Sequence, residues 1–134
     1  MILDKQNLFS EDQAVTVTAA STNVIDLGND HARVQALNEK GRIDILCQVT
    51  TAFASGTSID VAFQSDDDVA FGSPTTLRTT GAIATATLVA GYQFKIGTVP
   101  QINEQYLRLV YSVVGTMSAG NVMAGLVLDN QTST

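Results

Sequence analysis

The sequence predicts an all-β fold: an antiparallel β-sandwich of the jelly-roll type with eight or nine strands. Three observations predict this fold class. Apolar and polar residues alternate with a period of two in several short runs, as they do in strands with one buried face. Turn-forming residues separate these runs at intervals of roughly 8 to 14 residues. No segment has the length and periodicity of a long helix, so sheets must supply the core.

The first part of the chain predicts short elements. Residues 1–12 have no clear period and are expected to form an irregular N-terminal arm. In residues 13–18 valine alternates with threonine, which predicts a strand, and residues 24–27 predict a second, shorter one. A turn signal follows at 28–30, and residues 30–42 are interpreted as a loop or a single helical turn.

The middle of the chain predicts a hairpin and then several short strands. Residues 42–53 place Ile, Cys, Val and Phe on one face of a strand, and after a Ser-Gly break residues 57–64 return with a second alternating run. This pattern is typical of a hairpin. Strand-like runs with small side chains follow at 75–80 and 82–89, and another alternating run at 92–96.

The stretch from Gln105 to Asp129 dominates the prediction. It contains two apolar, β-branched runs, QYLRLVYSVVG and GNVMAGLVLD, joined by TMSA, which again is the pattern of an antiparallel hairpin. Arg108 is its only charge before Asp129, so we expect this hairpin in the middle of a sheet with both faces covered. The sandwich domain is expected to span residues 13–129, and residues 130–134 to form a polar tail.

Length and composition limit the possible functions. At 134 residues the chain fits one domain that can bury a sizeable core without disulfides. Charged residues make up 15%, against about 25% in an ordinary soluble domain, and the net charge is -6. The seven basic residues are scattered, so no nucleic-acid partner is expected. We recognise no signal peptide and no apolar run of about 20 residues, so we expect cytoplasmic synthesis and no membrane partner.

The sequence contains no recognisable catalytic or metal-binding motif. Its one histidine, His31, lies in a polar loop, and its one cysteine, Cys47, shares a strand face with apolar residues and is interpreted as a core residue. The acidic run Asp66, Asp67 and Asp68 could bind a hard cation, but its spacing is not that of a calcium loop, which favours a solvated acidic loop. We therefore expect no enzyme, no catalytic residue, no cofactor and no metal.

A weakly charged exterior suggests contact with other proteins. In the expected arm, Leu3, Leu8 and Phe9 are apolar within a segment too short to build a core of its own. They are candidates for contact with another protein or with a sister chain. The alternative is that they close one end of the sandwich.

Three parts of the sequence, taken together and in order, resemble the jelly-roll capsid cement proteins, also called decoration proteins, of short-tailed bacteriophages. They are MILDKQNLFSEDQAVT with ASTNVIDLG, then GSPTTLRTTGAIA with LVAGYQF, and finally QYLRLVYSVVGTMSAGNVMAGLVLD. The resemblance implies a virion protein, made in the bacterial cytoplasm, that binds the outside of the icosahedral shell. It also implies that the protein bridges major capsid protein subunits, resists the pressure of packaged DNA, and self-associates, with a homodimer expected before a trimer.

The alternative function is a ligand-binding β-sandwich module for a carbohydrate or another cell-surface group. Such a module needs an exposed aromatic platform, and the sequence contains no tryptophan. Tyr92, Tyr106 and Tyr111 are the candidates to supply it. Burial of all three would remove the platform.

Overall fold

The computed structural model describes residues 7–28, 43–99, 102 and 104–127. Over these residues the chain forms ten β-strands and a short 3-10 helix, and no α-helix. In chain order the elements are β1 (Leu8–Ala14), β2 (Ala19–Ala20), β3 (Ile25–Asp26), β4 (Asp44–Ala54), β5 (Ser58–Asp66), β6 (Thr75–Thr79), β7 (Ile83–Ala84), η2 (Thr85–Thr87), β8 (Gln93–Thr98), β9 (Tyr106–Val114) and β10 (Ala119–Val127).

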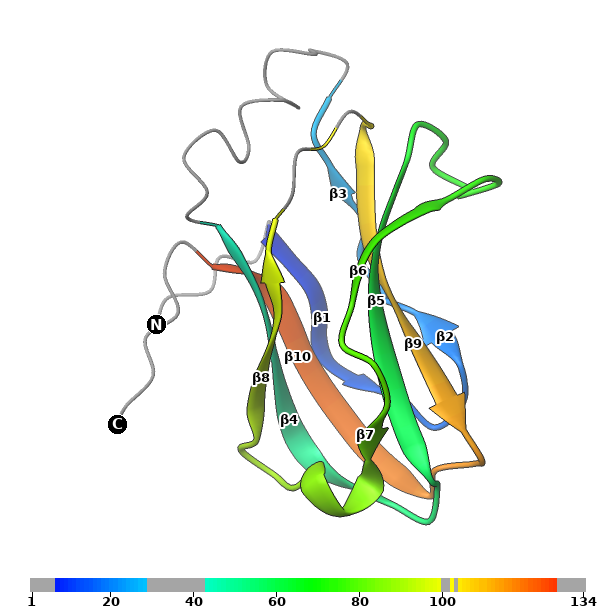
Figure 1. The fold of residues 1–134 in the computed structure, drawn as a ribbon, viewed down its shortest axis with the longest axis vertical. Helices are drawn as coiled ribbons and strands as arrows, with labels where there is room; N and C mark the ends of the chain where they lie inside the picture. Colours follow the sequence, from blue (N-terminus) through cyan, green and yellow to red (C-terminus); the bar gives the residue numbers. More distant parts are fainter. Residues whose placement is uncertain (1–6, 29–42, 100–101, 103, 128–134) are drawn as a thin grey trace.

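The strands form two antiparallel sheets that pack face to face (Figure 1). One sheet has the order β1-β10-β4-β8, and the other has the order β2-β9-β5-β6, with β3 also paired to β9 and β7 also paired to β5. Each sheet therefore has four strand positions. If β2 and β3 are counted as one position beside β9, and β6 and β7 as one position beside β5, the chain changes sheet at every step except from β5 to β6. This is the arrangement of an eight-position jelly roll. The expected fold class is confirmed.

The prediction of two long hairpins from the sequence is wrong. β4 and β5 lie in different sheets, and so do β9 and β10. The short connections 55–57 and 115–118 each cross from one sheet to the other. A crossover and a hairpin share one local pattern, two alternating runs and a turn, and differ only in the partners that each strand finds. The expected central position holds for β9 and for β10, but Ser112 and Val114 leave the outer face of β9 partly exposed.

The edge strand β1 takes up part of the expected irregular arm. Leu8 pairs with Gly125 and Ser10 pairs with Ala124, so β1 advances by two residues where β10 advances by one. This bulge leaves both Phe9 and Ser10 fully buried, and a second register shift follows before the strand ends. Bulges interrupt the period of two, so the sequence shows no alternation where this strand lies.

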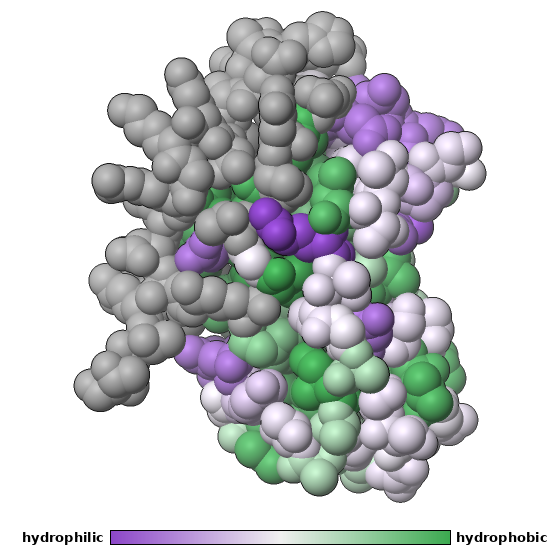
Figure 2. Space-filling model, viewed as in Figure 1, coloured by the Kyte–Doolittle hydropathy of each residue, from purple (hydrophilic) through white to green (hydrophobic). Residues whose placement is uncertain are grey.

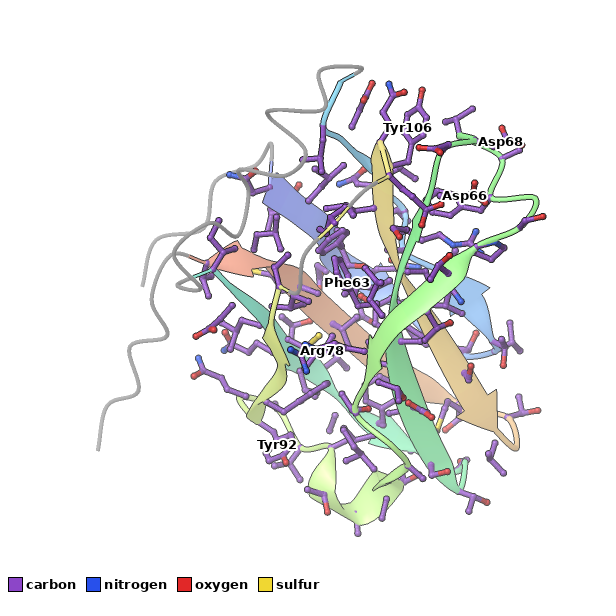
Figure 3. The ribbon with its side chains drawn as sticks, turned by 45° about the horizontal axis from the view of Figure 1, so that its top comes forward. Phe63, Asp66, Asp68, Arg78, Tyr92 and Tyr106 are labelled. Carbon is purple, nitrogen blue, oxygen red and sulfur yellow. The ribbon has the colours of Figure 1, made fainter. Side chains whose placement is uncertain are left out.

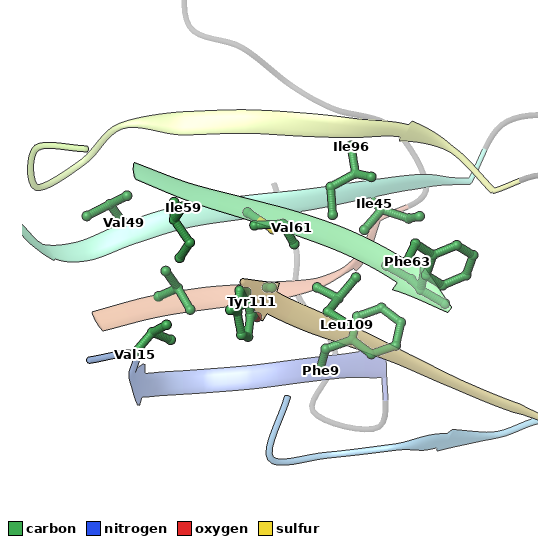
Figure 4. Packing of buried hydrophobic residues seen from close by; sticks show 14 of the residues in the cluster. Phe9, Val15, Ile45, Val49, Ile59, Val61, Phe63, Ile96, Leu109 and Tyr111 are labelled. Atoms are coloured by element: carbon green, nitrogen blue, oxygen red, sulfur yellow. The ribbon is translucent and has the colours of Figure 1, made fainter. Parts of the chain in front are cut away.

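The core lies between the two sheets and takes side chains from all the long strands (Figure 4). Tyr111, Phe9 and Phe63 are the largest fully buried side chains. The alternation predicted for β4 and β5 is confirmed at Ile45, Cys47, Val49, Ile59, Val61 and Phe63, which all face inward. Thr51, which the same alternation places on the inner face of β4, is instead exposed, because the pairing of β4 with β10 shifts register there.

Two shorter predictions differ from the structure. Of the strand expected at 13–18, only the first two residues belong to a strand, and Val17 is exposed. The strand expected at 82–89 shortens to β7 and then turns through η2. Three expectations lie outside the described residues: those for the arm before residue 7, for the loop 30–42 with His31, and for the tail 130–134.

Candidate functional site

Two of the three residues expected to contact other proteins are buried in the single chain. Phe9 has no exposed surface, and its ring packs edge-on against Phe63 with 6.0 Å between the centroids. Leu8 is 7% exposed and lies over Gly125, where an added Cβ would come within 2.9 Å of its Cδ2 atom. Phe9 packs in the core between the two sheets, whereas Leu8 is buried outside that core cluster, and in the single chain both offer little exposed surface. Leu3 lies outside the described residues.

The three tyrosines do not form one aromatic platform. Tyr111 is fully buried, whereas Tyr92 and Tyr106 are half-buried. Figure 3 shows Tyr106 and Tyr92 at opposite ends of the molecule. The ring of Tyr92 stacks on that of Phe94, with 5.7 Å between the centroids and 27° between the planes. A ligand that needs two tyrosines side by side has no site of that kind here.

The lower end of the sandwich in Figure 1 is built from four segments that carry no charged side chain. They are residues 15–18, 55–57, 85–91 and 114–118, and we name this surface the uncharged end. Its exposed residues are Thr, Ser, Ala, Val and Gly. In Figure 2 the lowest part of the molecule is correspondingly pale or green, whereas purple residues gather at the upper right.

Exposed valine side chains are concentrated at the uncharged end. Five large apolar side chains are exposed in the described part of the chain, and three of them lie here. These three are Val17, Val89 and Val114, at 56%, 54% and 56% exposure. They stand among small hydroxyl and methyl groups, so this end can approach another protein closely.

Backbone hydrogen bonds join the segments of the uncharged end to one another. The amide of Met117 donates to the carbonyl of Thr16 at 3.0 Å, and the amide of Thr57 donates to the carbonyl of Val114 at 2.9 Å. The amide of Thr85 in turn donates to the carbonyl of Thr57 at 3.1 Å. The segments therefore hold each other in place.

Side chains reinforce the same end. The Oγ atoms of Ser55 and Ser118 lie 2.8 Å apart in a hydrogen bond between the two crossover connections. The Met117 side chain is only 2% exposed and fills the space beside Gly56, where an added Cβ would come within 2.3 Å of its sulfur. These contacts fix the conformation of the uncharged end within the single chain.

The opposite end of the sandwich is acidic (Figure 3), and we name it the acidic end. Its carboxylates are those of Asp26, Asp66, Asp67, Asp68 and Glu104. Gln105 links two of them: its amide donates to Asp67 Oδ1 at 3.2 Å and its side-chain Nε2 donates to Asp26 Oδ1 at 2.9 Å. The charges of the described sandwich are therefore unevenly distributed between its two ends.

The acidic run serves as a source of hydrogen-bond acceptors for its own loop. Asp66 Oδ1 accepts from the amide of Asp68 and Oδ2 from the amide of Ser73, each at 3.0 Å. The bond from Asp68 is the main reason that the pKa of Asp66 lies below its ordinary value, and the charge of Arg108 adds to the effect. Asp66 is also buried, unlike a freely solvated acid. Within the described ranges, no group of three or more His, Cys, Asp or Glu residues could hold a metal ion.

Arg108 joins the acidic loop to the sheet. Its guanidinium carbon lies 4.2 Å from the centre of the buried Phe71 ring, a cation–π contact, and its Nε donates to Gln64 Oε1 at 3.0 Å. Phe71 takes a positive φ of 52°, an unusual conformation for a residue with a large side chain. The contact with Arg108 helps to hold this loop conformation in place.

A family model described as Bbp16 matches residues 9–126, from the second residue of β1 to the penultimate residue of β10. The chain belongs to the Bbp16 family. Bbp16 is a family of phage proteins, and this agrees with the phage relationship that the sequence resemblance implied. A comparison with curated proteins finds no match. Among the described residues, no helix is long and apolar enough to cross a lipid bilayer.

Both ends of the sandwich lie inside the Bbp16 match, yet sequence reasoning identified only the acidic run. A signal for the uncharged end was present, because each of its segments lies within a long run without charge. These runs are residues 13–25, 45–59, 79–94 and 109–128. Nothing local shows that the four runs turn at the same end of the molecule, which is a property of the jelly-roll topology.

Proposed function

We propose that the protein is a phage capsid cement protein. In this role it binds the outer surface of the icosahedral shell, bridges neighbouring major capsid protein subunits and stabilises the particle against the pressure of packaged DNA. It catalyses no reaction and needs no cofactor. It is made in the cytoplasm of the bacterial host and acts on the outside of the virion, with neither nucleic acid nor membrane as a partner.

The main support for the proposal is the uncharged end, in a chain that belongs to a family of phage proteins. A surface of Thr, Ser, Ala and Val can be removed from water at modest cost, because it has no ion to desolvate. Its segments are already fixed by mutual hydrogen bonds, so docking orders little new chain. These properties suit a protein that acts by adhesion to other proteins.

Multivalency explains how small contacts could reinforce a shell. A shell presents many equivalent sites, so a protein with two contact surfaces can bind a second site at high effective concentration once it is bound to the first. Each contact can then be weak while the bridged shell is held firmly. Leu3 of the N-terminal arm stays a candidate for one of these contacts.

The alternative function, a ligand-binding module, has less support. Tyr111 is buried, and Tyr92 and Tyr106 lie at opposite ends of the sandwich. Tyr92 and Tyr106 are each half-buried, and Tyr92 is already stacked on Phe94. A glycan screen with the wild-type protein and with Tyr92→Ala and Tyr106→Ala variants tests this alternative, which requires binding that one of the substitutions abolishes.

Particles of the phage that encodes the chain, produced with its gene deleted, test the cement function. Purified protein is added to expanded shells, bound protein is measured by cosedimentation, and the temperature of DNA release is followed with a DNA-binding dye. We expect saturable binding and a higher release temperature than for untreated particles. An unrelated acidic protein of similar size is the control for non-specific adsorption. Shells that take up none of the protein would refute the proposal.

A further inference from the structure

We infer that residues 1–6 of this chain bind the outer face of the sheet β1-β10-β4-β8, where they cover an apolar patch. The patch consists of Leu8, Leu46 and Val127, and we name it the outer patch. Residues 1–6 lie outside the described residues, so the observations that carry the inference belong to the patch and to the chain that borders it. The inference goes beyond the proposed function, because it concerns a contact within one chain before any shell is bound.

The outer patch is buried although it faces away from the core. Leu46 lies between two core residues of β4, so its side chain points to the other face of the sheet. Val127 follows the core residue Leu126 and points outward for the same reason. Leu8, Leu46 and Val127 are nevertheless only 7%, 2% and 3% exposed, and none of them belongs to the core cluster. Some part of the chain must therefore cover them.

The three side chains form one continuous patch across three neighbouring strands (Figure 1). Leu8 of β1 pairs with Gly125 of β10, and Gly125 pairs with Leu46 of β4. Val127 lies two residues beyond Gly125 on the same face of β10. Within the described ranges, every strand belongs to one of the two sheets, and the second sheet packs on the core side. No described strand therefore lies over the outer patch.

The cover is local to one part of this face. The next cross-strand row on the same face is Gln48 paired with Met123, and both of these residues are half-buried. Further along β4, Thr51 and Ala52 are exposed. The outer patch is thus covered while the rest of the face is open, which a short segment of chain explains better than a large element.

The backbone at the start of β1 approaches the outer patch from above. A Cβ added to Gly125 would point to the outer face, where it would lie 2.9 Å from the backbone oxygen of Asn7 and 2.9 Å from Leu8 Cδ2. The backbone of Asn7 therefore reaches β10 on the outer side of the sheet. Glycine at position 125 leaves room for this close approach. The chain that precedes Asn7 continues from this point, directly beside the patch.

Residues 1–6 have the length and the side chains to cover the outer patch. Leu46 lies two strand spacings from β1, about 10 Å at roughly 4.8 Å per spacing, whereas six extended residues reach about 20 Å at roughly 3.3 Å each. Ile2 and Leu3 provide two large apolar side chains. Residues 128–134 contain only one, in an otherwise polar run. A shell contact through Leu3 would first have to displace this side chain from the patch.

Serine substitutions within residues 1–6 test the contact through stability. Ile2→Ser with Leu3→Ser removes the apolar side chains, while Lys5→Ser with Gln6→Ser is the control in the same segment. In urea denaturation of the full chain, we expect the first pair to raise the equilibrium constant for unfolding at least about tenfold, because two apolar contacts are lost. The control pair should change it by less than about twofold. A dye that fluoresces on apolar surface should bind the first variant more strongly than the control.

A spin label tests where the segment lies. A nitroxide is attached to Lys5→Cys, and Cys47 does not compete for it because its side chain is fully buried. The label broadens the NMR signals of nearby amides, and this effect falls steeply with distance. We expect stronger broadening around Met123, on the outer face of the same sheet, than around Ala62, a half-buried residue on the outer face of the other sheet. Mixing spin-labelled with isotope-labelled protein measures any contact between chains.

Residues 29–42 are the competing cover, since they contain Val34 and Leu37 and precede β4. Val34→Ser with Leu37→Ser is therefore measured in the same way. Loss of stability in this variant, with none in the variant of Ile2 and Leu3, would assign the cover to residues 29–42 and overturn the inference. The expected loss in the Ile2 and Leu3 variant supports residues 1–6.

Three further results would overturn the inference. The first is an equal unfolding constant for the apolar pair and its control pair. The second is broadening around Ala62 that is as strong as the broadening around Met123. The third is broadening that appears only in the mixed sample, which would place the segment on a second copy. Broadening around Met123 within one chain, with a stability loss confined to the apolar pair, supports the contact.

Discussion

The phenolic oxygen of Tyr111 lies 2.7 Å from the Oγ of Ser10, and this hydrogen bond crosses the core from one sheet to the other. Both residues are fully buried. Ser10 donates its own proton to Gln13 Oε1 at 2.6 Å, so Tyr111 is the donor to Ser10. Burial raises the pKa of the Tyr111 phenol, which therefore keeps its proton at any physiological pH. The bond fixes the edge strand β1 to the centre of the opposite sheet.

Removing only the acceptor of this hydrogen bond should lower the free energy of unfolding more than removing both the donor and the acceptor. Ser10→Ala leaves the Tyr111 hydroxyl buried without an acceptor, which should lower the free energy of unfolding by about 1–3 kcal/mol. Tyr111→Phe, in the Ser10→Ala background, should restore part of that loss, because no buried donor is then unpaired. Urea denaturation of the two single variants and the double variant forms the cycle. Strictly additive effects would contradict the bond.

Gly120 should not tolerate a side chain. It has a φ of +146°, and an added Cβ would come within 2.3 Å of Cδ1 in the buried ring of Phe53. Gly120→Ala should therefore lower the free energy of unfolding by about 3 kcal/mol, through overpacking and backbone strain together. Gly81→Ala is the control, since Gly81 has a φ of +73° and no atom within 4 Å of the added Cβ. Its cost should be only about 1 kcal/mol, and equal melting temperatures would contradict the expected clash.

Asp66 should make the stability of the protein depend on pH in the acid range. Its pKa is lowered from the ordinary 3.8 by hydrogen bonds from loop amides, above all that of Asp68. A group with a lower pKa in the folded state stabilises that state above its unfolded pKa, and the stabilisation disappears as pH falls through the folded pKa. Asp66→Asn should therefore destabilise the protein at pH 7, because an amide cannot accept from both the Asp68 and the Ser73 amides. The unfolding curves of wild type and variant should converge at strongly acidic pH, and a constant difference would be the contrary result.

Cys47 should be chemically inert in the folded protein. Its side chain is fully buried in β4, and burial raises the pKa of its thiol, so the reactive thiolate is scarce. We expect no reaction with Ellman's reagent under native conditions and complete reaction in guanidinium chloride. Fast labelling of the native protein would show that the core opens readily between β4 and its neighbours.

The sequence pattern predicts individual strands well where alternation is long and regular. β4 and β5 have such alternation, and their inner faces were predicted correctly except at Thr51, which is exposed where β4 shifts register against β10. β1 was missed because its bulge places Phe9 and Ser10 side by side in the core. Strand partners were also missed, since pairs such as β1 with β10 join distant parts of the chain, while a local turn pattern suggests the nearest neighbour.

The candidate surface was less predictable than the fold. Leu8 and Phe9 were selected because they are apolar within a seemingly irregular segment, and both are buried in the single chain, Phe9 in the core between the sheets. The uncharged end depends on four turns that meet in space although up to about a hundred residues separate them in the chain. Its signal, the four long runs without charge, becomes meaningful only once the crossovers of β4 into β5 and of β9 into β10 are known.

The placement of β9 and β10 at the centres of their sheets determines when the protein can fold during synthesis. These are the last two strands of the described chain to leave the ribosome, and each provides the inner partner for strands made much earlier. A nascent chain that ends at residue 118 still lacks the strand that joins β1 to β4, so both have unpaired backbone groups. Stable structure must therefore await nearly the whole of the sandwich, and the early strands depend on solubility or on a chaperone until then.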